Sequence, residues 1–282
     1  MSAPTLPLDS AARATHDHSG LAIAFDDVWL SFEDNEVLRG VSFHLPLGET
    51  KAVFGVAGAG KSSILKLALG LLQPDSGQIT VLGNEVTRMH EHDLFPLRGQ
   101  IGMVFQESAL FDSFTVAENV AFRLMEERGV YDDEIDRRVR EALRFVELEH
   151  TLGMLPSALS GGMRRRVAIA RAIITQPELL LYDSPTGGLD PVTSNTIVEL
   201  ITKQRDVSKT SALLVTHRLQ DAFTMATHQF DLKTNQMRAL PHGRYCDVPM
   251  SFMVLRDGKV IFDGDVHQLA TTKDEYIREY VS

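Results

Sequence analysis

The segment that most constrains the fold of this chain runs from residue 55 to residue 63. It reads Gly55, Val56, Ala57, Gly58, Ala59, Gly60, Lys61, Ser62 and Ser63, which matches the pattern G-x-x-x-x-G-K-[ST]. A loop of this type turns its backbone N–H groups inward and cradles a polyphosphate at the positive end of the following helix. Lys61 is then expected to reach the β- and γ-phosphates, and Ser62 to offer its hydroxyl to a magnesium ion.

The residues on both sides of this loop support its interpretation as a phosphate site. Residues 50–54 are predicted to form a short buried strand, and residues 62–72 carry apolar side chains at helical spacing. A strand, a glycine-rich loop and a helix in this order are the context that the motif requires. A chance glycine-rich turn is the alternative, and the lysine and the hydroxyl make it the weaker one.

The bulk properties of the chain limit its class. Its 282 residues suffice for one large α/β domain, or for one domain with a smaller satellite. A formal net charge of −10 argues against a nucleic-acid partner. We expect a cytoplasmic protein, because no apolar run approaches the roughly 20 residues that span a bilayer. The single cysteine, Cys246, excludes an internal disulfide.

The first half of the chain divides into four stretches. Residues 1–19 lack hydrophobic periodicity and are predicted to be a mobile leader. Near-alternating apolar residues in 21–45 predict an antiparallel β flap, in which Phe32 could stack on a nucleotide base or, as its residue type alone favours, belong to the core. A strand is expected to end at Gln106, and residues of about 107–175 are predicted to form an inserted helical subdomain.

The second half carries further polar residues at the ends of predicted elements. Ser160, Gly161 and Gly162 open a helix, which makes either a second anion site or an ordinary cap. The apolar strand at 179–183 ends in Asp183, a Walker B pattern in which the carboxylate would hold magnesium opposite Ser62. Asp190 is placed to cap a helix, and the next buried strand ends at His217.

Taken in this order, the motifs resemble those of an ATP-binding cassette (ABC) ATPase subunit. The resemblance covers residues 21–228 and resumes at about 252–265. It implies an α/β fold of the P-loop NTPase type over residues 20–282, with a mostly parallel core sheet, an antiparallel β flap and the inserted helical subdomain. It also implies an ATPase that is coupled to transport across a membrane.

The resemblance assigns roles to individual residues. Phe32 resembles the base-stacking aromatic, Gln106 the residue that faces magnesium and the membrane partner, and His217 the switch histidine on the γ-phosphate. Ser160 to Gly162 resemble the signature that closes on the ATP of a second subunit, and Asp190 is counted with the nucleotide-binding residues. ATP, Mg²⁺, a head-to-tail second copy, a transmembrane permease and a place at the cytoplasmic face of the membrane follow from this resemblance.

Within the superfamily, the chain resembles the ATPase of MCE-associated lipid transporters of the maintenance-of-lipid-asymmetry type. The residues that carry this resemblance are Met163, the stretch 106–113 with 115–120, and the arginines at 164–166. It implies phospholipid as cargo and an MCE-domain lipid-binding subunit as a further partner. The ATPase subunits of methionine, phosphate and cell-division systems share much of this sequence pattern.

The sequence departs from the family pattern at two places. Ser184 stands where the family has the glutamate that polarises the attacking water, so the general base and the rate of hydrolysis are open. Residues 229–251 read as an inserted loop or a binding element, the plain loop being favoured. Two rival functions are a slow regulatory cassette, motivated by Ser184, and a soluble ABC protein of translation or DNA repair, which needs paired cassettes. The residues do not identify the cargo or its direction.

Overall fold

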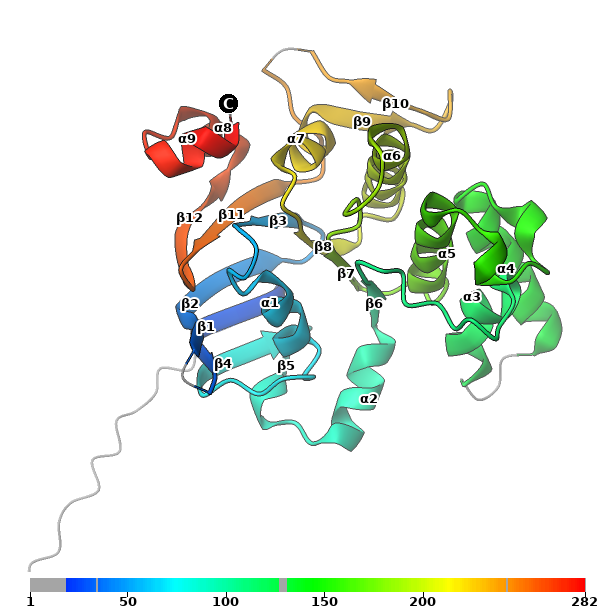
Figure 1. Cartoon of the computed structure of the whole chain (residues 1–282), viewed down its shortest axis with the longest axis horizontal. Coiled ribbons are helices and arrows are strands. Elements are labelled where there is room, and N and C mark those ends of the chain that lie inside the picture. The colour runs from blue at the N-terminus through cyan, green and yellow to red at the C-terminus, as the bar shows by residue number, and fades with distance from the viewer. Residues whose placement is uncertain (1–18, 34, 127–130, 242, 282) are drawn as a thin grey trace, which may run out of the picture.

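A six-stranded sheet forms the centre of the molecule (Figure 1). Its strand order is β12-β11-β3-β8-β7-β6, and every neighbouring pair is parallel except β11 with β12. The strands are β3 (Thr50–Phe54), β6 (Ile101–Val104), β7 (Leu179–Asp183), β8 (Ser211–Val215), β11 (Met250–Arg256) and β12 (Lys259–Asp265). The computed structural model describes residues 19–33, 35–126, 131–241 and 243–281, so the leader predicted at 1–19 lies outside the described residues except for Ser19.

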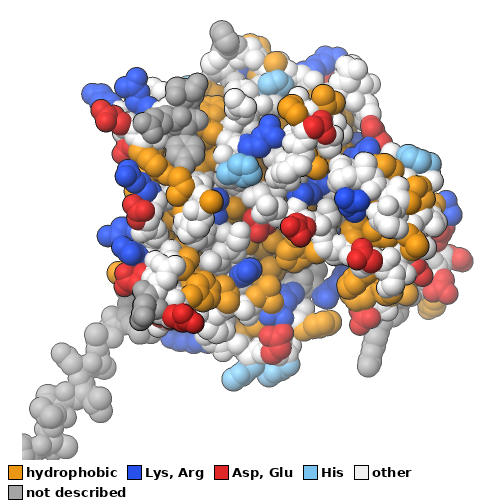
Figure 2. Space-filling view, in the orientation of Figure 1, with side chains coloured by type: hydrophobic (Ala, Val, Ile, Leu, Met, Phe, Trp, Pro, Cys, Tyr) orange, Lys and Arg blue, Asp and Glu red, His pale blue; other side chains and the backbone are white. Residues whose placement is uncertain are grey.

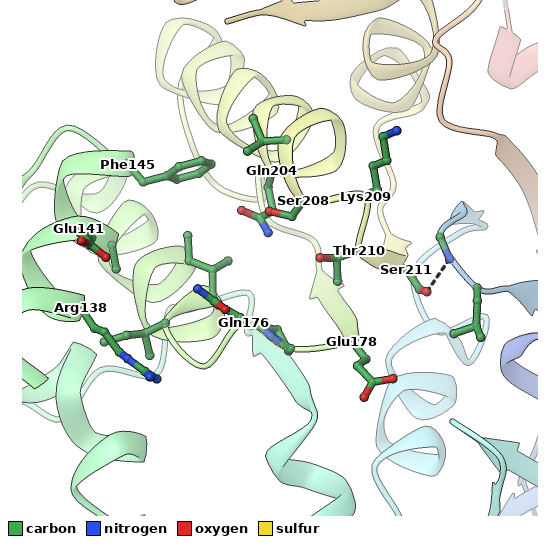
Figure 3. A pocket seen from close by; sticks show the side chains of 17 residues that line it. Arg138, Glu141, Phe145, Gln176, Glu178, Gln204, Ser208, Lys209, Thr210 and Ser211 are labelled. Atoms are coloured by element: carbon green, nitrogen blue, oxygen red, sulfur yellow. Dashed lines mark hydrogen bonds between the residues drawn. The ribbon is translucent and has the colours of Figure 1, made fainter. Parts of the chain in front are cut away.

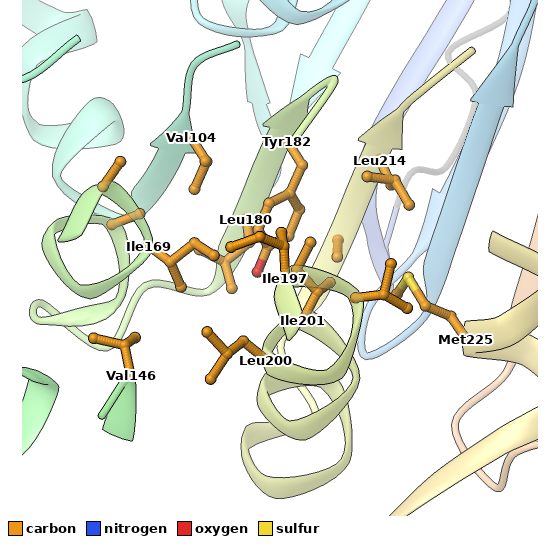
Figure 4. Packing of buried hydrophobic residues seen from close by; sticks show 14 of the residues in the cluster. Val104, Val146, Ile169, Leu180, Tyr182, Ile197, Leu200, Ile201, Leu214 and Met225 are labelled. Atoms are coloured by element: carbon orange, nitrogen blue, oxygen red, sulfur yellow. The ribbon is translucent and has the colours of Figure 1, made fainter. Parts of the chain in front are cut away.

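The parallel strands are buried on both faces because each of their faces packs against a different layer. In β3, Ala52 and Phe54 belong to one apolar cluster, whereas Val53 belongs to the other. β7 alternates in the same way, with Tyr182 on the side of the helices (Figure 4). Successive side chains of these strands point to opposite faces of the sheet, and both faces are buried. Most residues of the strands are therefore apolar.

One face of the sheet is covered by an antiparallel flap and two helices. The flap has the order β2-β1-β4-β5, and Phe25 of β1 stacks on Phe43 of β2 with ring centroids 4.8 Å apart. The predicted flap of residues 21–45 therefore extends to a third and a fourth strand. The elements of this layer are β1 (Leu21–Phe32), β2 (Asn35–Pro46), β4 (Ser76–Val81), β5 (Asn84–Glu85), α1 (Lys61–Ala68) and α2 (Glu91–Gly99).

A helical lobe is inserted between β6 and β7. It consists of α3 (Val116–Met125), α4 (Asp132–Phe145) and α5 (Gly161–Ile173). α3 begins with a capping box between Thr115 and Glu118. The fully buried side chain of Asn119 bonds the backbone of Phe111 and Phe114, and so holds the segment that enters the lobe.

Residues 229–251 are not the plain loop that the sequence favoured. β9 (His228–Asp231) and β10 (Gln236–Ala239) form an antiparallel hairpin that lies across α6 (Pro191–Ser208). The carboxylate of Asp206 accepts a 2.7 Å hydrogen bond from Phe230 N and pairs with Arg205, whose side chain is almost fully buried. The two strands pair with each other, but the hairpin is held in place by α6, whose Asp206 lies 24 residues before Phe230 in the sequence, and the pattern of residues 229–251 alone does not reveal this support.

The remaining helices complete the layers. α7 (Leu219–Thr227) follows β8, and α8 (Val266–Thr271) and α9 (Glu275–Val281) follow β12. Within the described ranges, no helix combines the length and the apolar character needed to cross a bilayer.

Candidate nucleotide site

The site lies at one edge of the parallel sheet. Gly55 follows β3, Gln106 follows β6, and His217 follows β8, while Asp183 is the last residue of β7. Because these four strands run parallel in one sheet, their carboxyl ends meet at the same edge. The fold therefore gathers the predicted phosphate loop with three of the predicted polar residues.

The glycines of the phosphate loop allow close contacts that a side chain would prevent. A Cβ on Gly55 would lie 2.5 Å from Leu255 O, and one on Gly60 would lie 2.7 Å from Leu38 Cδ2. Gly60 also has a φ of +93°, which favours glycine. It is the N-cap of α1, and among the described residues no side chain caps this end of the helix. Its first N–H groups are thus available to an anion.

The ammonium of Lys61 lies against the start of the loop. It donates hydrogen bonds of 2.8 Å to the carbonyls of both Gly55 and Val56. Burial lowers the pKa of Lys61, while the negative charge of Asp183 acts to raise it. A polyphosphate in the loop would offer this buried cation the anionic partner that two carbonyls do not supply.

Ser62 and Asp183 provide oxygen ligands from two different elements. The Ser62 hydroxyl donates a 3.1 Å hydrogen bond to Oδ1 of Asp183. A hydroxyl and one carboxylate suit Mg²⁺, which typically keeps several waters and binds substrate phosphates besides one or two carboxylates. In the described part of the chain, no group of three His, Cys, Asp or Glu side chains could hold a metal by itself. The donor set therefore fits a magnesium ion that arrives with a nucleotide.

Ser184 follows Asp183 in a tight turn. Its φ is +46°, its N–H donates to Val215 O at 2.8 Å, and its carbonyl accepts from Gly187 N at 2.8 Å. The side chain is buried, at 7% exposure. Gln106 lies beside this turn, because its Cγ is 3.6 Å from the position of a Cβ on Gly187. His217 is exposed at the end of β8.

The predicted signature segment lies next to a second helix start. Ser160 is the N-cap of α5, and its Oγ accepts from Met163 N at 3.2 Å. A Cβ on Gly162 would lie 2.3 Å from Thr193 Cγ2, so α5 begins directly on the first turn of α6. Asp190 caps that turn through Thr193 N. Ser160 and Asp190 thus cap their own helices, and Gly162 brings the two helix starts together.

Phe32 lies at the end of β1, with 47% of its side chain exposed. It is therefore not a core residue, contrary to the preference based on its residue type. Its neighbouring strand β2 borders the phosphate loop through Leu38 and Gly60.

Three polar residues that the sequence analysis did not assign connect these loops. Thr186 donates to the buried carboxylate of Asp221 on α7. Arg165 of α5 donates to backbone carbonyls on both sides of the site. Arg165 could have been found, because it interrupts the buried stripe of α5, where only apolar residues are expected.

A cavity elsewhere in the molecule does not belong to this site. It has a volume of about 600 Å³ and lies between α4, the ends of α5 and α6, and the start of β8 (Figure 3). Ser211, the first residue of β8, lines it, whereas the nucleotide site is at the carboxyl ends of the strands. The cavity thus lies at the opposite end of the parallel sheet.

Comparison with known proteins gives matches over most of the chain. The family profile described as ABC transporter matches residues 38–187. Protein TRIGALACTOSYLDIACYLGLYCEROL 3, chloroplastic, of Arabidopsis thaliana is 35% identical over 279 residues, which cover 96% of this chain and 76% of that protein. The intermembrane phospholipid transport system ATP-binding protein MlaF of Haemophilus influenzae is 29% identical over 248 residues, which cover 88% and 85% of the two chains.

Two further matches are to a longer import protein and to a solved structure. The methionine import ATP-binding protein MetN of Bifidobacterium longum is 41% identical, but the match covers 70% of this chain and about half (51%) of that protein's length. Among solved structures, a dimeric post-hydrolysis state of the ATP-binding cassette MJ0796 bound to ADP and Pi superposes with a TM-score of 0.72 at 26% identity, covering 86% of this chain and 98% of the other.

Proposed function

The chain belongs to the ABC transporter family and is an ATP-binding, ATP-hydrolysing subunit of that kind, and from this premise we propose that it drives the transport of phospholipid in an MCE-associated system. It would act as the motor on the cytoplasmic face of a membrane. Its partners would be a transmembrane permease, a second copy of itself and an MCE-domain lipid-binding subunit.

The observation that carries this proposal is the length of the matches to proteins with lipid-related names. Two such relatives match this chain over 96% and 88% of its length. The methionine import relative has a higher identity but is twice as long as the matched part. A likeness that extends over most of both chains supports a shared task better than one that covers about half of the relative.

Nucleotide binding is attributed to the residues at the sheet edge. The phosphate loop and the amino end of α1 would hold the polyphosphate, and Lys61 would move from the carbonyls of Gly55 and Val56 to the β- and γ-phosphates. Ser62 and Asp183 would hold Mg²⁺, which when bound supplies charge neutralisation between the β- and γ-phosphates. Phe32, exposed at the end of β1, would stack on the base.

The second copy is needed to complete each site. Gly162 packs on Thr193 at the start of α6, and Ser160 caps α5 two residues before it. A head-to-tail pair would place them on the ATP of the other copy, so that the nucleotide joins the two subunits. The dimeric state of the related cassette, which is bound to ADP and Pi, supports this arrangement.

A groove beside Gln106 is suited to a short helix of the permease. A cavity of about 270 Å³ is lined by Phe105, Phe111 and Phe122, which are 39%, 41% and 36% exposed. Phe111 packs against Phe122 with ring centroids 4.7 Å apart. Hydrophobic groups are also visible on the helical lobe at the right of Figure 2. An aromatic-lined groove between the core and the lobe favours an amphipathic helix as its occupant.

Hydrolysis would proceed without a glutamate after Asp183. Gln106 and His217 would orient the attacking water, and Ser184 could at most hydrogen-bond to it. Phosphoryl transfer depends mainly on positioning and on stabilisation of the transferring charge, which Lys61 and the loop amides still supply. We therefore infer slow turnover.

The test is purification of the native membrane complex through a tag on this chain, followed by reconstitution. The expected complex contains a permease and an MCE-domain subunit, and it carries bound phospholipid that mass spectrometry detects. Transfer of a fluorescent phospholipid between the complex and liposomes should require ATP and should stop in the Lys61→Ala complex. Co-purification with an amino-acid permease, without ATP-dependent lipid transfer, would refute the lipid assignment while leaving the ATPase intact.

A further inference from the structure

Arg165 connects two segments of the site, the one before Gln106 and the turn at 184–187, through three backbone carbonyls. Its Nη1 donates to Phe105 O at 3.3 Å and to Ser184 O at 3.2 Å, and its Nη2 donates to Gly187 O at 3.4 Å. Phe105 directly precedes Gln106, and Ser184 stands at the position of the missing glutamate. One side chain of α5 therefore touches the backbone on both sides of the place where water would be oriented.

This arrangement is a poor one for stability alone. Arg165 is 4% exposed, its hydrogen bonds go to backbone carbonyls, and within the described ranges its Nε has no hydrogen-bond partner. Its three bonds are longer than the usual 2.9 to 3.0 Å of N–H···O bonds. Burial lowers the pKa of the guanidinium, and the charges of Asp183 and Glu107 only partly oppose this. A buried cation with such partners needs an explanation other than stability.

The position of Arg165 on α5 suggests that explanation. α5 begins at Ser160 and Gly161, and Arg165 follows a little more than one turn later on the same helix. An α-helix moves as a rigid unit over so short a distance. A displacement of the signature segment would therefore reach the backbone of Phe105 and Ser184 through Arg165.

We infer that Arg165 is a positioning residue for ATP hydrolysis, which aligns Gln106 and Ser184 of its own subunit when the signature segment of that subunit closes on the ATP of the partner copy. This inference rests on the proposed head-to-tail pair. The helix of Arg165 begins with the signature segment, which contacts the ATP of the partner copy. The carbonyls that Arg165 binds lie beside the ATP of its own subunit, so Arg165 links the two composite sites of the pair. Its long hydrogen bonds tighten on closure, as bonds at catalytic sites do when the substrate complex forms.

The neighbouring Arg166 provides a matched control. Its Nη1 donates to Val146 O at 3.3 Å, and both residues belong to the helical lobe. Replacing Arg166 by glutamine removes the same charge from the same helix and the same type of bond to a carbonyl. It leaves Phe105, Ser184 and Gly187 untouched.

The experiment compares the full-length wild type with Arg165→Gln, Arg165→Lys and Arg166→Gln. We expect Arg165→Gln to lower kcat about tenfold to hundredfold, as small misplacements of reacting groups do, while KM and the equilibrium affinity for ATP stay within about twofold. The Hill coefficient for ATP should fall towards unity, because the two sites are no longer linked. Arg165→Lys should recover part of the loss, and Arg166→Gln should behave as the wild type.

Hydrogen–deuterium exchange provides a readout that does not need turnover. The amides of 105–108 and 184–187 should exchange faster in Arg165→Gln than in the wild type, and not in Arg166→Gln. The inference is overturned if exchange in these segments is unchanged, if kcat and the Hill coefficient are unchanged, or if Arg166→Gln has the same effect. Hydrogen–deuterium exchange and ATP hydrolysis are measured on this chain without permease or lipid. A failure of the proposed lipid transport is therefore distinguishable from a failure of this inference.

Discussion

The hydroxyl of Ser62 lies 3.1 Å from a carboxylate oxygen of Asp183, although 121 residues separate the two in sequence. Ser62 is in the first turn of α1, and Asp183 ends β7. The strands β3 and β7 are both neighbours of β8 in the parallel sheet, which brings the loop after one beside the end of the other. The contact defines where the phosphates and their metal ion are expected.

Lys61→Ala should weaken ATP binding by roughly a hundredfold. Hydrogen bonds to charged groups contribute about 1.5 to 3 kcal/mol, and about 1.4 kcal/mol corresponds to a factor of ten in affinity. Isothermal titration with ATP measures the change. The matched control is Lys66→Ala, because Lys66 is an exposed lysine in the last turn of the same helix. The affinity of this variant for ATP should not change. An unchanged affinity in Lys61→Ala would reject the phosphate-loop assignment.

The composite site predicts the behaviour of mixed dimers. A Ser160→Arg subunit paired with a Lys61→Ala subunit should keep one intact site, whereas each homodimer keeps none. ATP-dependent dimerisation and hydrolysis of the mixed pair should therefore reach about half of the wild-type level. Since Ser160 also caps α5, loss of about 1 kcal/mol of stability is expected and should be checked by urea unfolding.

The control for this pair is a doubly substituted subunit combined with a wild-type subunit. Neither of its two composite sites is intact, so it should be inactive if Ser160 acts on the ATP of the other copy. Activity of this control at about half of the wild-type level, together with an inactive first pair, would show that each chain completes its own site.

Ser184→Glu should accelerate hydrolysis. A positioned general base is typically worth about 10² to 10⁴ in rate, and serine cannot accept a proton from water at neutral pH as a carboxylate can. Single-turnover hydrolysis at saturating ATP and magnesium measures the effect. Ser184→Gln, of equal length but without the charge, should remain slow, and His217→Ala should be slower than the wild type. Fast wild-type turnover that Ser184→Glu leaves unchanged would mean that another residue already serves as the base.

Asp206→Ala should destabilise the protein by about 3 kcal/mol. The substitution removes the acceptor of Phe230 N and leaves the buried Arg205 without its carboxylate, and breaking a buried pair costs roughly this much. The control is Asp231→Ala, which removes a more exposed ion pair with Arg238 and should cost less than about 1 kcal/mol. Urea unfolding compares the two variants. Equal losses would contradict the role of Asp206 in holding the β9–β10 hairpin.

Local patterns were enough to predict most of the core. The strands of the parallel sheet were predicted within one or two residues at 50–54, 101–105, 179–183 and 211–216, and the α/β fold with its antiparallel flap is confirmed. The reason is that burial on both faces leaves a continuous apolar run, and a glycine-rich loop with a lysine has a characteristic spacing. Both signals are contained in a few consecutive residues.

Tertiary structure decided what depends on contacts across the chain. The β9–β10 hairpin is held by Asp206, Arg205 and Glu199 of α6. The sequence of residues 229–251 does not by itself predict any of these hydrogen bonds. Arg165 likewise binds carbonyls 60, 19 and 22 residues away, and any sequence can supply a carbonyl. A motif of side chains can be recognised from the residue types and their spacing. Which backbone carbonyl a side chain binds depends on the path of the folded chain, because every residue carries a carbonyl.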